Sequence, residues 1–216
     1  MATKQPIAVC FALEEESGPF RRSSEGKVPM FFTGIGRANA NRTVREFLAN
    51  NAPDLLVTCG FAGGLIPELK IGDVLFVAGE SGSKELYDSV RTKLTAAGAR
   101  EGKIACVDRI ATTAKEKQKL HSDTGADAAE MESAAVHDVC RERGIPCVTV
   151  RVISDTSEHD LPLDFNNFLK EDKSVDMSKL MMAVAKAPWK MGALMELQKN
   201  AKTAANRLAE VLMKLV

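Results

Sequence analysis

The pair Ser154-Asp155 stands where a proton-transferring residue would be useful. It follows Cys147–Ile153, the most strand-like run in the chain. Aspartate forms strands poorly, so its place at the end of an apolar run favours a ligand-binding or catalytic function. A carboxyl group there can give a proton to a leaving group or take one from a nucleophile. A turn, or a cap for the next helix, is the alternative.

A second candidate is the triplet Glu130-Met131-Glu132, which lies where a short apolar stretch meets the start of a predicted helix. Carboxylates two residues apart do not share one helical face, so the two glutamates should have different functions. One can bind the hydroxyl groups of a sugar while the other stabilises the fold. The alternative is that both are favourable charges at a helix N-terminus.

The stretch Gly60-Phe61-Ala62-Gly63-Gly64 follows a predicted strand. Glycines let a backbone approach a ligand closely, and such a loop can hold an anion or a ribose with its N–H groups. It is neither a P-loop, because the Gly-Lys-Ser/Thr ending is missing, nor a GxGxxG fingerprint. A tight turn is the alternative.

Short apolar runs that alternate with amphipathic stretches must position these residues. This order predicts an α/β fold with a largely parallel sheet, covered on both faces because its strands are continuously apolar. Ligands bind beyond the carboxyl ends of such strands. Polar or glycine-rich residues fall at five such ends: Glu14–Glu16, Thr33–Gly36, Gly60–Gly64, Asp108 and Ser154-Asp155. The predicted strands are Pro6–Ala12, Val28–Thr33, Leu55–Cys59, Asp73–Ala78, Lys103–Val107 and Cys147–Ile153, and the predicted helices are Arg37–Asn50, Glu85–Ala97, Thr112–His121 and Met131–Arg143.

The C-terminal third has a different character. Residues Asp155–Asp176 predict a loop with a short helix around Phe165–Leu169, and a long amphipathic helix is expected from Pro188 to the end. The tail is rich in lysine. One interpretation is a solvated face on a helix that packs over the sheet. The other is a surface that meets a membrane or an apolar substrate.

Composition excludes several classes of protein. The chain has 216 residues, and 29 Lys and Arg balance 29 Asp and Glu, so its formal net charge is zero. This balance argues against general nucleic-acid binding, which needs a basic surplus. The length suits one domain, and we expect residues 1–216 to form a single domain.

Cysteine and histidine usage argues against a cofactor. The five cysteines have no Cys-x-x-Cys spacing, and the three histidines do not cluster, so we predict no metal or redox cofactor. Neither a signal peptide nor a membrane span is recognisable. Buried, reduced cysteines are typical of the cytoplasm, which is the expected location.

Several motifs together resemble the nucleoside phosphorylase/nucleosidase superfamily, which includes the methylthioadenosine/S-adenosylhomocysteine nucleosidases. They are ALEEE, TGIG, CGFAGGLIPELKIGDV, EMESAAV and VRVISD, followed ten residues after Asp155 by Phe165. The stretch VDRIATTAKEKQKLHSDTGA and the terminal helix are more similar to the hopanoid-associated phosphorylase branch. The resemblance implies a three-layer αβα sandwich around a mixed, largely parallel, twisted sheet.

The resemblance also implies the catalytic residues. Asp155 would protonate N7 of the purine, with Ser154 beside it to orient the carboxyl group. Glu16 would activate the attacking water. These functions suit cleavage of an N-glycosidic bond, which passes through an oxocarbenium-like sugar and resembles glycoside hydrolysis by two carboxylates.

Binding residues follow from the same resemblance. Glu132 would bind the ribose 2′ and 3′ hydroxyls, with Met131 packed against the nucleoside. Phe165 would close over the base, and Ile110 holds a position that often stacks with it. Phe61, Ala62 and Gly63 would contribute the glycine-rich stretch.

The expected reaction is hydrolysis of an adenosine derivative, such as 5′-methylthioadenosine or S-adenosylhomocysteine, with release of adenine. Phosphorolytic members supply Arg and Ser near the glycine-rich stretch, whereas Thr58–Phe61 contains neither. Arg21, Arg22 or Arg37 would have to replace them. The alternative is a phosphorylase that acts on an adenosylated lipid or another purine nucleoside, with phosphate as co-substrate.

Two further readings remain open. A non-catalytic nucleoside sensor would bind without cleaving, and an unrelated α/β domain would match these motifs by chance. The resemblance implies a homo-oligomer, preferably a dimer. The segment between Ala78 and Lys103 is shorter than in typical methylthioadenosine nucleosidases, where it helps to complete the 5′ pocket of the partner. The 5′ specificity and the dimer are therefore open.

Overall fold

The computed structural model describes residues 3–79, 81–170, 173 and 175–216. Its sheet follows the strand order β2-β1-β3-β8-β4-β5, with β7 paired to β3 and β6 paired to β7. Strands β1 and β2, β1 and β3, β3 and β8, β4 and β5, and β6 and β7 are parallel, whereas β4 and β8, and β3 and β7, are antiparallel. The strands are β1 Thr3–Phe11, β2 Met30–Phe32, β3 Asn51–Gly64, β4 Val74–Ala78, β5 Arg100–Glu101, β6 Ile104–Cys106, β7 Ala128–Glu130 and β8 Cys147–Asp155.

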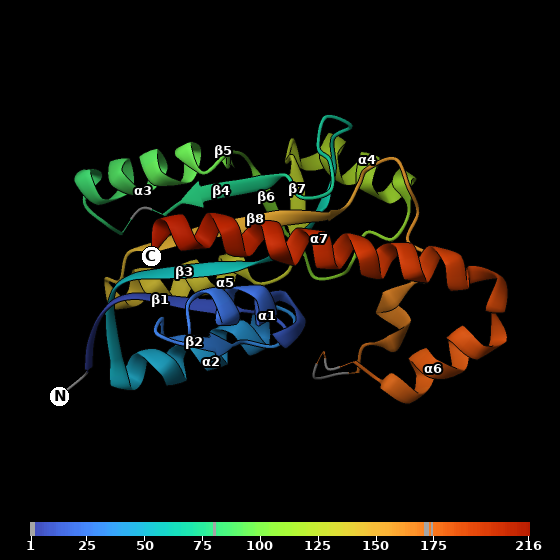
Figure 1. Ribbon diagram of the computed structural model, residues 1–216, viewed down its shortest axis with the longest axis horizontal. Coiled ribbons are helices and arrows are strands. Elements are labelled where there is room, and N and C mark those ends of the chain that lie inside the picture. Colours follow the sequence, from blue (N-terminus) through green and yellow to red (C-terminus); the bar gives the residue numbers. More distant parts are fainter. Residues whose placement is uncertain (1–2, 80, 171–172, 174) are drawn as a thin grey trace.

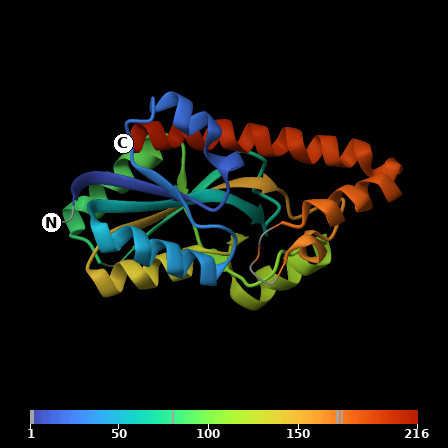
Figure 2. The ribbon, with the colours of Figure 1, turned by 90° about the horizontal axis from the view of Figure 1, so that it is seen from below.

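Helices cover both faces of this sheet. Figure 2 shows α1 and α7 on one side and α2 and α5 on the other. The helices are α1 Glu14–Ser23, α2 Arg37–Asn50, α3 Lys84–Ala96, α4 Ala114–Thr124, α5 Ser133–Arg143, α6 Met177–Lys186 and α7 Met191–Leu215, with 3₁₀ helices η1 Phe165–Phe168 and η2 Pro188–Lys190. The predicted three-layer αβα sandwich with a mixed, largely parallel sheet is confirmed.

Strand β1 shows why the strands are apolar throughout. Val9 and Phe11 belong to the core cluster that contains α7, whereas Ala8 and Cys10 belong to the cluster that contains α2 and α5. Successive side chains of a strand point to opposite faces, so a strand covered on both sides needs apolar residues at every position. The same arrangement brings the carboxyl ends of β1, β3 and β8 to one edge.

The glycine-rich stretch Gly60–Gly64 is neither the turn nor the loop that the sequence suggested. It continues β3, which pairs with β8 up to Gly63 and has a register shift between Ala62 and Gly63. Glycine is required here so that the carboxylate of Glu16 can lie close to the backbone of β3, and not to reverse the direction of the chain. An alanine Cβ at Gly60, where φ is +153°, would lie 2.7 Å from Glu16 Oε1.

Some elements were not predicted. Glu14–Glu16 begins helix α1, which contains Pro19, a residue that disfavours helix interiors. Strand β7 has only three residues, too few to show a period. Helix α6 follows the predicted loop, of which Glu171, Asp172 and Ser174 lie outside the described residues. The terminal helix begins at Met191 after a 3₁₀ turn, close to the predicted Pro188.

Within the described part of the chain, no helix combines the length and hydrophobicity that crossing a membrane requires. All five cysteines are free thiols, and Cys106 is the most accessible of them.

Candidate active site

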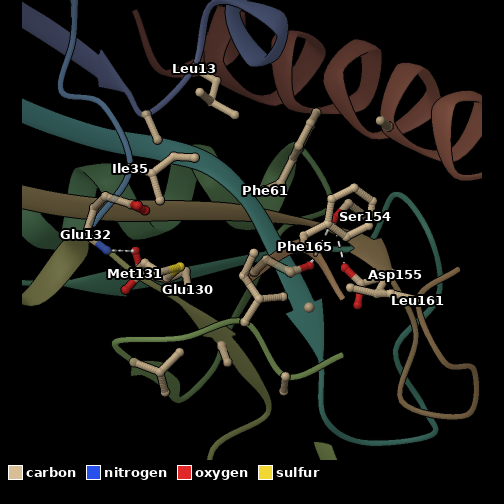
Figure 3. Close-up of a pocket in the computed structure, with 18 of the residues that line it drawn as sticks. Leu13, Ile35, Phe61, Glu130, Met131, Glu132, Ser154, Asp155, Leu161 and Phe165 are labelled. Atoms are coloured by element: carbon tan, nitrogen blue, oxygen red, sulfur yellow. Dashed lines mark hydrogen bonds between the residues drawn. The ribbon is translucent and has the colours of Figure 1, made fainter. Parts of the chain in front are cut away.

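A cavity of about 390 Å³ lies at the carboxyl ends of β3, β7 and β8 (Figure 3). All ten residues that the sequence singled out line it. Its other lining residues are chiefly apolar, which is typical of small-molecule sites. The predicted residues are Glu16, Phe61, Ala62, Gly63, Ile110, Met131, Glu132, Ser154, Asp155 and Phe165; the others are Ala12, Leu13, Ile35, Leu65, Val107, Ala111, Lys117, Ala129, Glu130, Leu161, Leu197 and Ala201.

The cavity has two polar ends. Figure 3 shows Glu130, Met131 and Glu132 on one side and Ser154 and Asp155 on the other, with aromatic side chains between them. A ligand that spans the cavity therefore meets carboxylates at both ends and apolar surface along its length.

Asp155 is held through both of its carboxylate oxygens. Ser154 Oγ donates to Asp155 Oδ1 at 3.1 Å. Lys117 Nζ lies 2.7 Å from Asp155 Oδ2, and the Lys117 side chain is 1% exposed against 19% for Asp155. Close packing adds to this restraint, since a Cβ at Gly63 would lie 3.1 Å from Asp155 Oδ2. The side chain of Asp155 is thus fixed in position toward the cavity.

Lys117 is a buried cation that the sequence analysis missed. Besides Asp155, its ammonium group donates to Thr156 O at 2.7 Å and to His159 O at 3.1 Å, so each of its three protons has an acceptor. It comes from α4, which begins at a capping box in which Thr113 accepts from the Glu116 N–H. No local signal could have separated it from the exposed Lys115 and Lys119 on the same helix.

Glu130 is occupied by the protein itself. Its carboxylate accepts from Ser133 Oγ at 2.6 Å, from Arg151 Nη2 at 2.6 Å and from the N–H of Glu132 at 3.0 Å. Burial alone would raise the pKa of Glu130, but the Arg151 charge and the Ser133 hydrogen bonds outweigh burial, and the pKa lies below its usual range. Glu130 therefore orders the start of α5.

Arg151 is a second buried cation without a predicted function. It also donates to Thr58 Oγ1 at 3.2 Å and lies 3.9 Å from Glu132 Oε2. Burial disfavours its charge, yet the neighbouring Glu130 and Glu132 raise its pKa further above the ordinary value. The signal was present in the sequence, because an arginine inside an apolar strand requires buried acidic partners.

Glu132 faces the cavity with much of its hydrogen-bonding capacity free. Its Oε1 accepts from the Gly36 N–H at 2.8 Å, and its side chain is about 10% exposed. Burial raises the pKa of Glu132 to about 7; the charges of Glu130 and Glu16 add to this, whereas the Arg151 charge opposes it. The two glutamates of the triplet thus differ, as their spacing predicted.

Glu16 is held by three backbone N–H groups. Its Oε2 accepts from Ala12 N and Leu13 N at 3.0 Å each, and its Oε1 accepts from Phe61 N at 2.9 Å. Burial raises the pKa of Glu16 despite these hydrogen bonds. The carboxylate is therefore desolvated yet rigidly placed, which suits a general base.

One side chain connects Phe165 and Ile110. Asn166 accepts from the Ile110 N–H at 2.9 Å and donates to Ile110 O at 3.0 Å. Because Asn166 follows Phe165 in η1, this pair of hydrogen bonds fixes the aromatic ring relative to Ile110. The rings of Phe165 and Phe168 are also arranged edge to face, with their centres 6.3 Å apart. Asn166 had not been predicted as a site residue.

None of the arginines considered as phosphate ligands lines the cavity. Arg37 donates to Cys106 O and pairs with Asp108, and the Arg21 guanidinium lies 5.5 Å from the centre of the Phe32 ring. Arg22 is exposed. Among the described residues that line the cavity, Lys117 is the single cation, and Asp155 neutralises it.

The sequence has relatives among enzymes of known name. A 5′-methylthioadenosine/S-adenosylhomocysteine nucleosidase of Shewanella halifaxensis is 26% identical over 165 residues, which are 63% of this chain and 72% of the relative. The enzyme of the same name from an Exiguobacterium species is 28% identical over 189 residues, which are 74% of this chain and 80% of the relative.

Solved structures share the fold. A Helicobacter pylori 5′-methylthioadenosine/S-adenosylhomocysteine nucleosidase with butyl-thio-DADMe-Immucillin-A has a TM-score of 0.70 at 19% identity, covering 98% of this chain and 97% of that one. Futalosine hydrolase of the same organism has a TM-score of 0.69 at 19% identity with the same coverage. The family description that matches this chain, over residues 14–80 and 76–216, is that of the phosphorylase superfamily. Because these segments together cover residues 14–216, which is most of the chain, the chain belongs to the phosphorylase superfamily.

Proposed function

We propose that this protein hydrolyses the N-glycosidic bond of an adenosine derivative and releases adenine. The observation that carries the proposal is one largely apolar cavity that places Asp155 at one end and Glu132 at the other, with Glu16 also lining it. A volume of about 390 Å³ suits a nucleoside. The relatives are named 5′-methylthioadenosine/S-adenosylhomocysteine nucleosidases, and these names support adenosine derivatives as substrates.

The base binds at the Asp155 end in this proposal. As the C1′–N9 bond breaks, its electron pair moves into the purine, and N7 receives a proton through Asp155. Lys117 Nζ lies 2.7 Å from Asp155 Oδ2, so in this proposal the ammonium group supplies the proton that Asp155 passes to N7. Ser154 keeps the second oxygen of Asp155 in place. Phe165 and Ile110, joined by Asn166, enclose the base.

The sugar binds at the Glu132 end. A carboxylate that accepts one protein hydrogen bond can also accept from two ribose hydroxyls, and Met131 supplies an apolar contact. Hydrogen bonds that strengthen as positive charge develops on the sugar would lower the barrier. Ile35, which precedes the glycine whose N–H holds Glu132, also lines the cavity, so part of the surface near the sugar is apolar.

Glu16 completes the reaction. A water molecule beside it adds its oxygen to C1′ and gives a proton to the carboxylate, so that the products are adenine and the free 5-substituted ribose. The raised pKa that burial gives Glu16 makes it a stronger base than an exposed glutamate.

Charge favours water over phosphate as the nucleophile. The described residues that line the cavity include four carboxylates, those of Glu16, Glu130, Glu132 and Asp155, and one cation, Lys117, which is paired with Asp155. A phosphate dianion would meet repulsion there without an arginine fork to bind it. A phosphorylase with phosphate as co-substrate is the alternative. The homodimer and the cytoplasmic location remain predictions.

The test is adenine release from 5′-methylthioadenosine, S-adenosylhomocysteine and adenosine, each with and without phosphate, followed by chromatography. Hydrolysis predicts equal rates in both buffers and a free sugar. Turnover that requires phosphate and yields a sugar 1-phosphate would establish the phosphorylase instead. Binding without cleavage of any substrate would favour the sensor.

A further inference from the structure

Six large apolar side chains are exposed on one small part of the molecule. Of the seven large hydrophobic residues that are exposed in the described chain, all but Val216 lie between residues 177 and 195. Their exposed fractions range from 45% for Met191 to 75% for Trp189. We call residues 177–195, which form α6, η2 and the start of α7, the helical arm. The six are Met177, Met181, Met182, Trp189, Met191 and Met195.

The helical arm extends away from the sheet. Figures 1 and 2 both show α6 and the first half of α7 meeting at a tip beyond the rest of the fold. Lys190 ties the arm to the body by donating to Pro162 O at 2.8 Å. At its start, Asp176 caps α6 by accepting from the Lys179 N–H at 3.1 Å. The arm is therefore held in place by a hydrogen bond to the body of the protein and by a capped helix.

Helix α6 has two faces but no buried residue. With 3.6 residues per turn, Met177, Met181 and Val184 share one face. Lys179 and Lys186 lie on the opposite face, where Met182 is their neighbour. A helix of ten residues is marginal in water without packing. Its apolar face thus indicates a surface that covers it.

Charge identifies that surface. The arm contains three lysines and no aspartate or glutamate. An amphipathic helix with lysines on its polar face and a neighbouring tryptophan is typical of a segment that lies in the interface of a lipid bilayer. Lysines beside such a segment add attraction to anionic headgroups.

A second copy of the chain is a poorer occupant. In a two-fold contact the same patch meets itself, so an arm with three lysines, of which Lys179 lies 3.9 Å from Asp176, would meet a second arm of the same net positive charge. We therefore propose that the helical arm docks this protein on the surface of an anionic lipid bilayer, with α6 lying in the interface. Helix α7 links this surface to the candidate site, because its Leu197 and Ala201 line the cavity two to six residues beyond Met195.

The chain carries its own reporter for this proposal. Trp189 is the one tryptophan of the sequence and is 75% exposed. Full-length protein is mixed with vesicles of phosphatidylglycerol and phosphatidylcholine in equal parts, or of phosphatidylcholine alone. We expect co-sedimentation and a blue shift of tryptophan emission with the anionic vesicles, both weakened by salt.

Variants separate the apolar and the charged contributions. Met181→Ser with Met195→Ser keeps the reporter and should abolish partition. Lys179→Gln with Lys186→Gln should weaken partition to anionic vesicles by about 30-fold, since each lysine near such a surface contributes a factor of about five. The matched control, Lys70→Gln with Lys84→Gln, removes the same charge from exposed sites off the arm and should bind as the wild type does.

Three results would overturn the proposal. The first is a wild-type protein that does not bind anionic vesicles. The second is equal loss of binding in the arm variant and its control. The third is a blue shift without vesicles that grows with protein concentration, which would assign the surface to a second copy. Adenine release in solution by the Met181→Ser, Met195→Ser variant should equal that of the wild type, so this test and that of the proposed function fail separately.

Discussion

Lys117 Nζ and Asp155 Oδ2 form an ion pair at 2.7 Å between helix α4 and the end of strand β8. The lysine is fully buried, and its other two donors are used by Thr156 O and His159 O. Asp155 is therefore not an isolated carboxyl group at a strand end. It is one half of a pair whose cation is shielded from solvent and whose anion faces the cavity.

This ion pair predicts that substitutions of Lys117 and Asp155 have non-additive effects on kcat. Asp155→Asn should lower kcat by about 10²- to 10⁴-fold while nucleoside affinity stays near the wild-type value, because general-acid catalysis is lost and the pocket shape is kept. Lys117→Met should also lower kcat in the wild-type background, but hardly at all in the Asp155→Asn background. The measurement is a double-mutant cycle on adenine release. Equal losses in both backgrounds would mean that Lys117 does not act through Asp155.

Removal of Lys117 should also affect stability. The carbonyl oxygens of Thr156 and His159 lose their donor and Asp155 loses its cation, so Lys117→Met should reduce the free energy of unfolding by about 1–3 kcal/mol. Denaturant unfolding measures this effect separately from turnover. Lys115→Met, an exposed position on the same helix, is the matched control and should change stability little.

The raised pKa of Glu132 predicts a pH-dependent cost in stability. Its pKa is about 7 in the fold against 4.5 for an ordinary glutamate, because of burial. The folded state thus holds a proton that the unfolded state has released between pH 4.5 and 7, so the stabilising contribution of Glu132, complete below pH 4.5, is lost as the pH rises to about 7. Glu132→Gln should therefore gain stability relative to the wild type between pH 5 and pH 8, by at most about 3 kcal/mol.

Chemical denaturation at pH 5 and pH 8 measures this difference. Glu142→Gln is the control, because the hydrogen bond from Arg45 lowers the pKa of Glu142 from its ordinary value of 4.5, which places its titration below this pH range. The stability of this variant relative to the wild type should stay nearly constant between pH 5 and pH 8. A Glu132→Gln difference that stays constant or shrinks as the pH rises would show that Glu132 is ionised without cost.

Glu132 should also distinguish nucleosides from free bases. If its carboxylate binds the ribose hydroxyls, Glu132→Gln weakens adenosine derivatives by about tenfold or more, since hydrogen bonds to a charged group contribute about 1.5–3 kcal/mol. Free adenine, which lacks the sugar, should bind as before. Calorimetric titration with both ligands is the measurement, and equal weakening of the two would place Glu132 away from the ribose.

Gly60 should be required for the position of Glu16. The Cβ of Gly60→Ala would lie 2.7 Å from Glu16 Oε1 at a φ of +153°, so the carboxylate must move or the strand must shift. We expect a loss of more than about 1 kcal/mol of stability and a kcat reduced at least about tenfold. Gly192→Ala, in open space on helix α7, is the control and should be neutral or stabilising. Full activity of Gly60→Ala would remove Glu16 from the reaction.

Local patterns in the sequence were sufficient for the sheet and for the residues at its carboxyl edge. Continuous apolar runs such as Cys147–Ile153 predict strands covered on both faces, and parallel strands bring their ends together whatever the details of packing. Glu16 and Asp155 could therefore be placed at one edge from the sequence, whereas Glu132, which follows the unpredicted strand β7, was identified only through the motif that surrounds it.

Tertiary structure alone decided which charges meet. Lys117 has the same local surroundings as the exposed Lys115 and Lys119, and only the packing of α4 against the end of β8 buries it beside Asp155. The arm of α6 likewise has an apolar period that would suit a core helix, and the fold leaves it exposed. A periodic pattern specifies which face of an element is apolar, but what that face or a charged side chain contacts depends on segments far away in the chain.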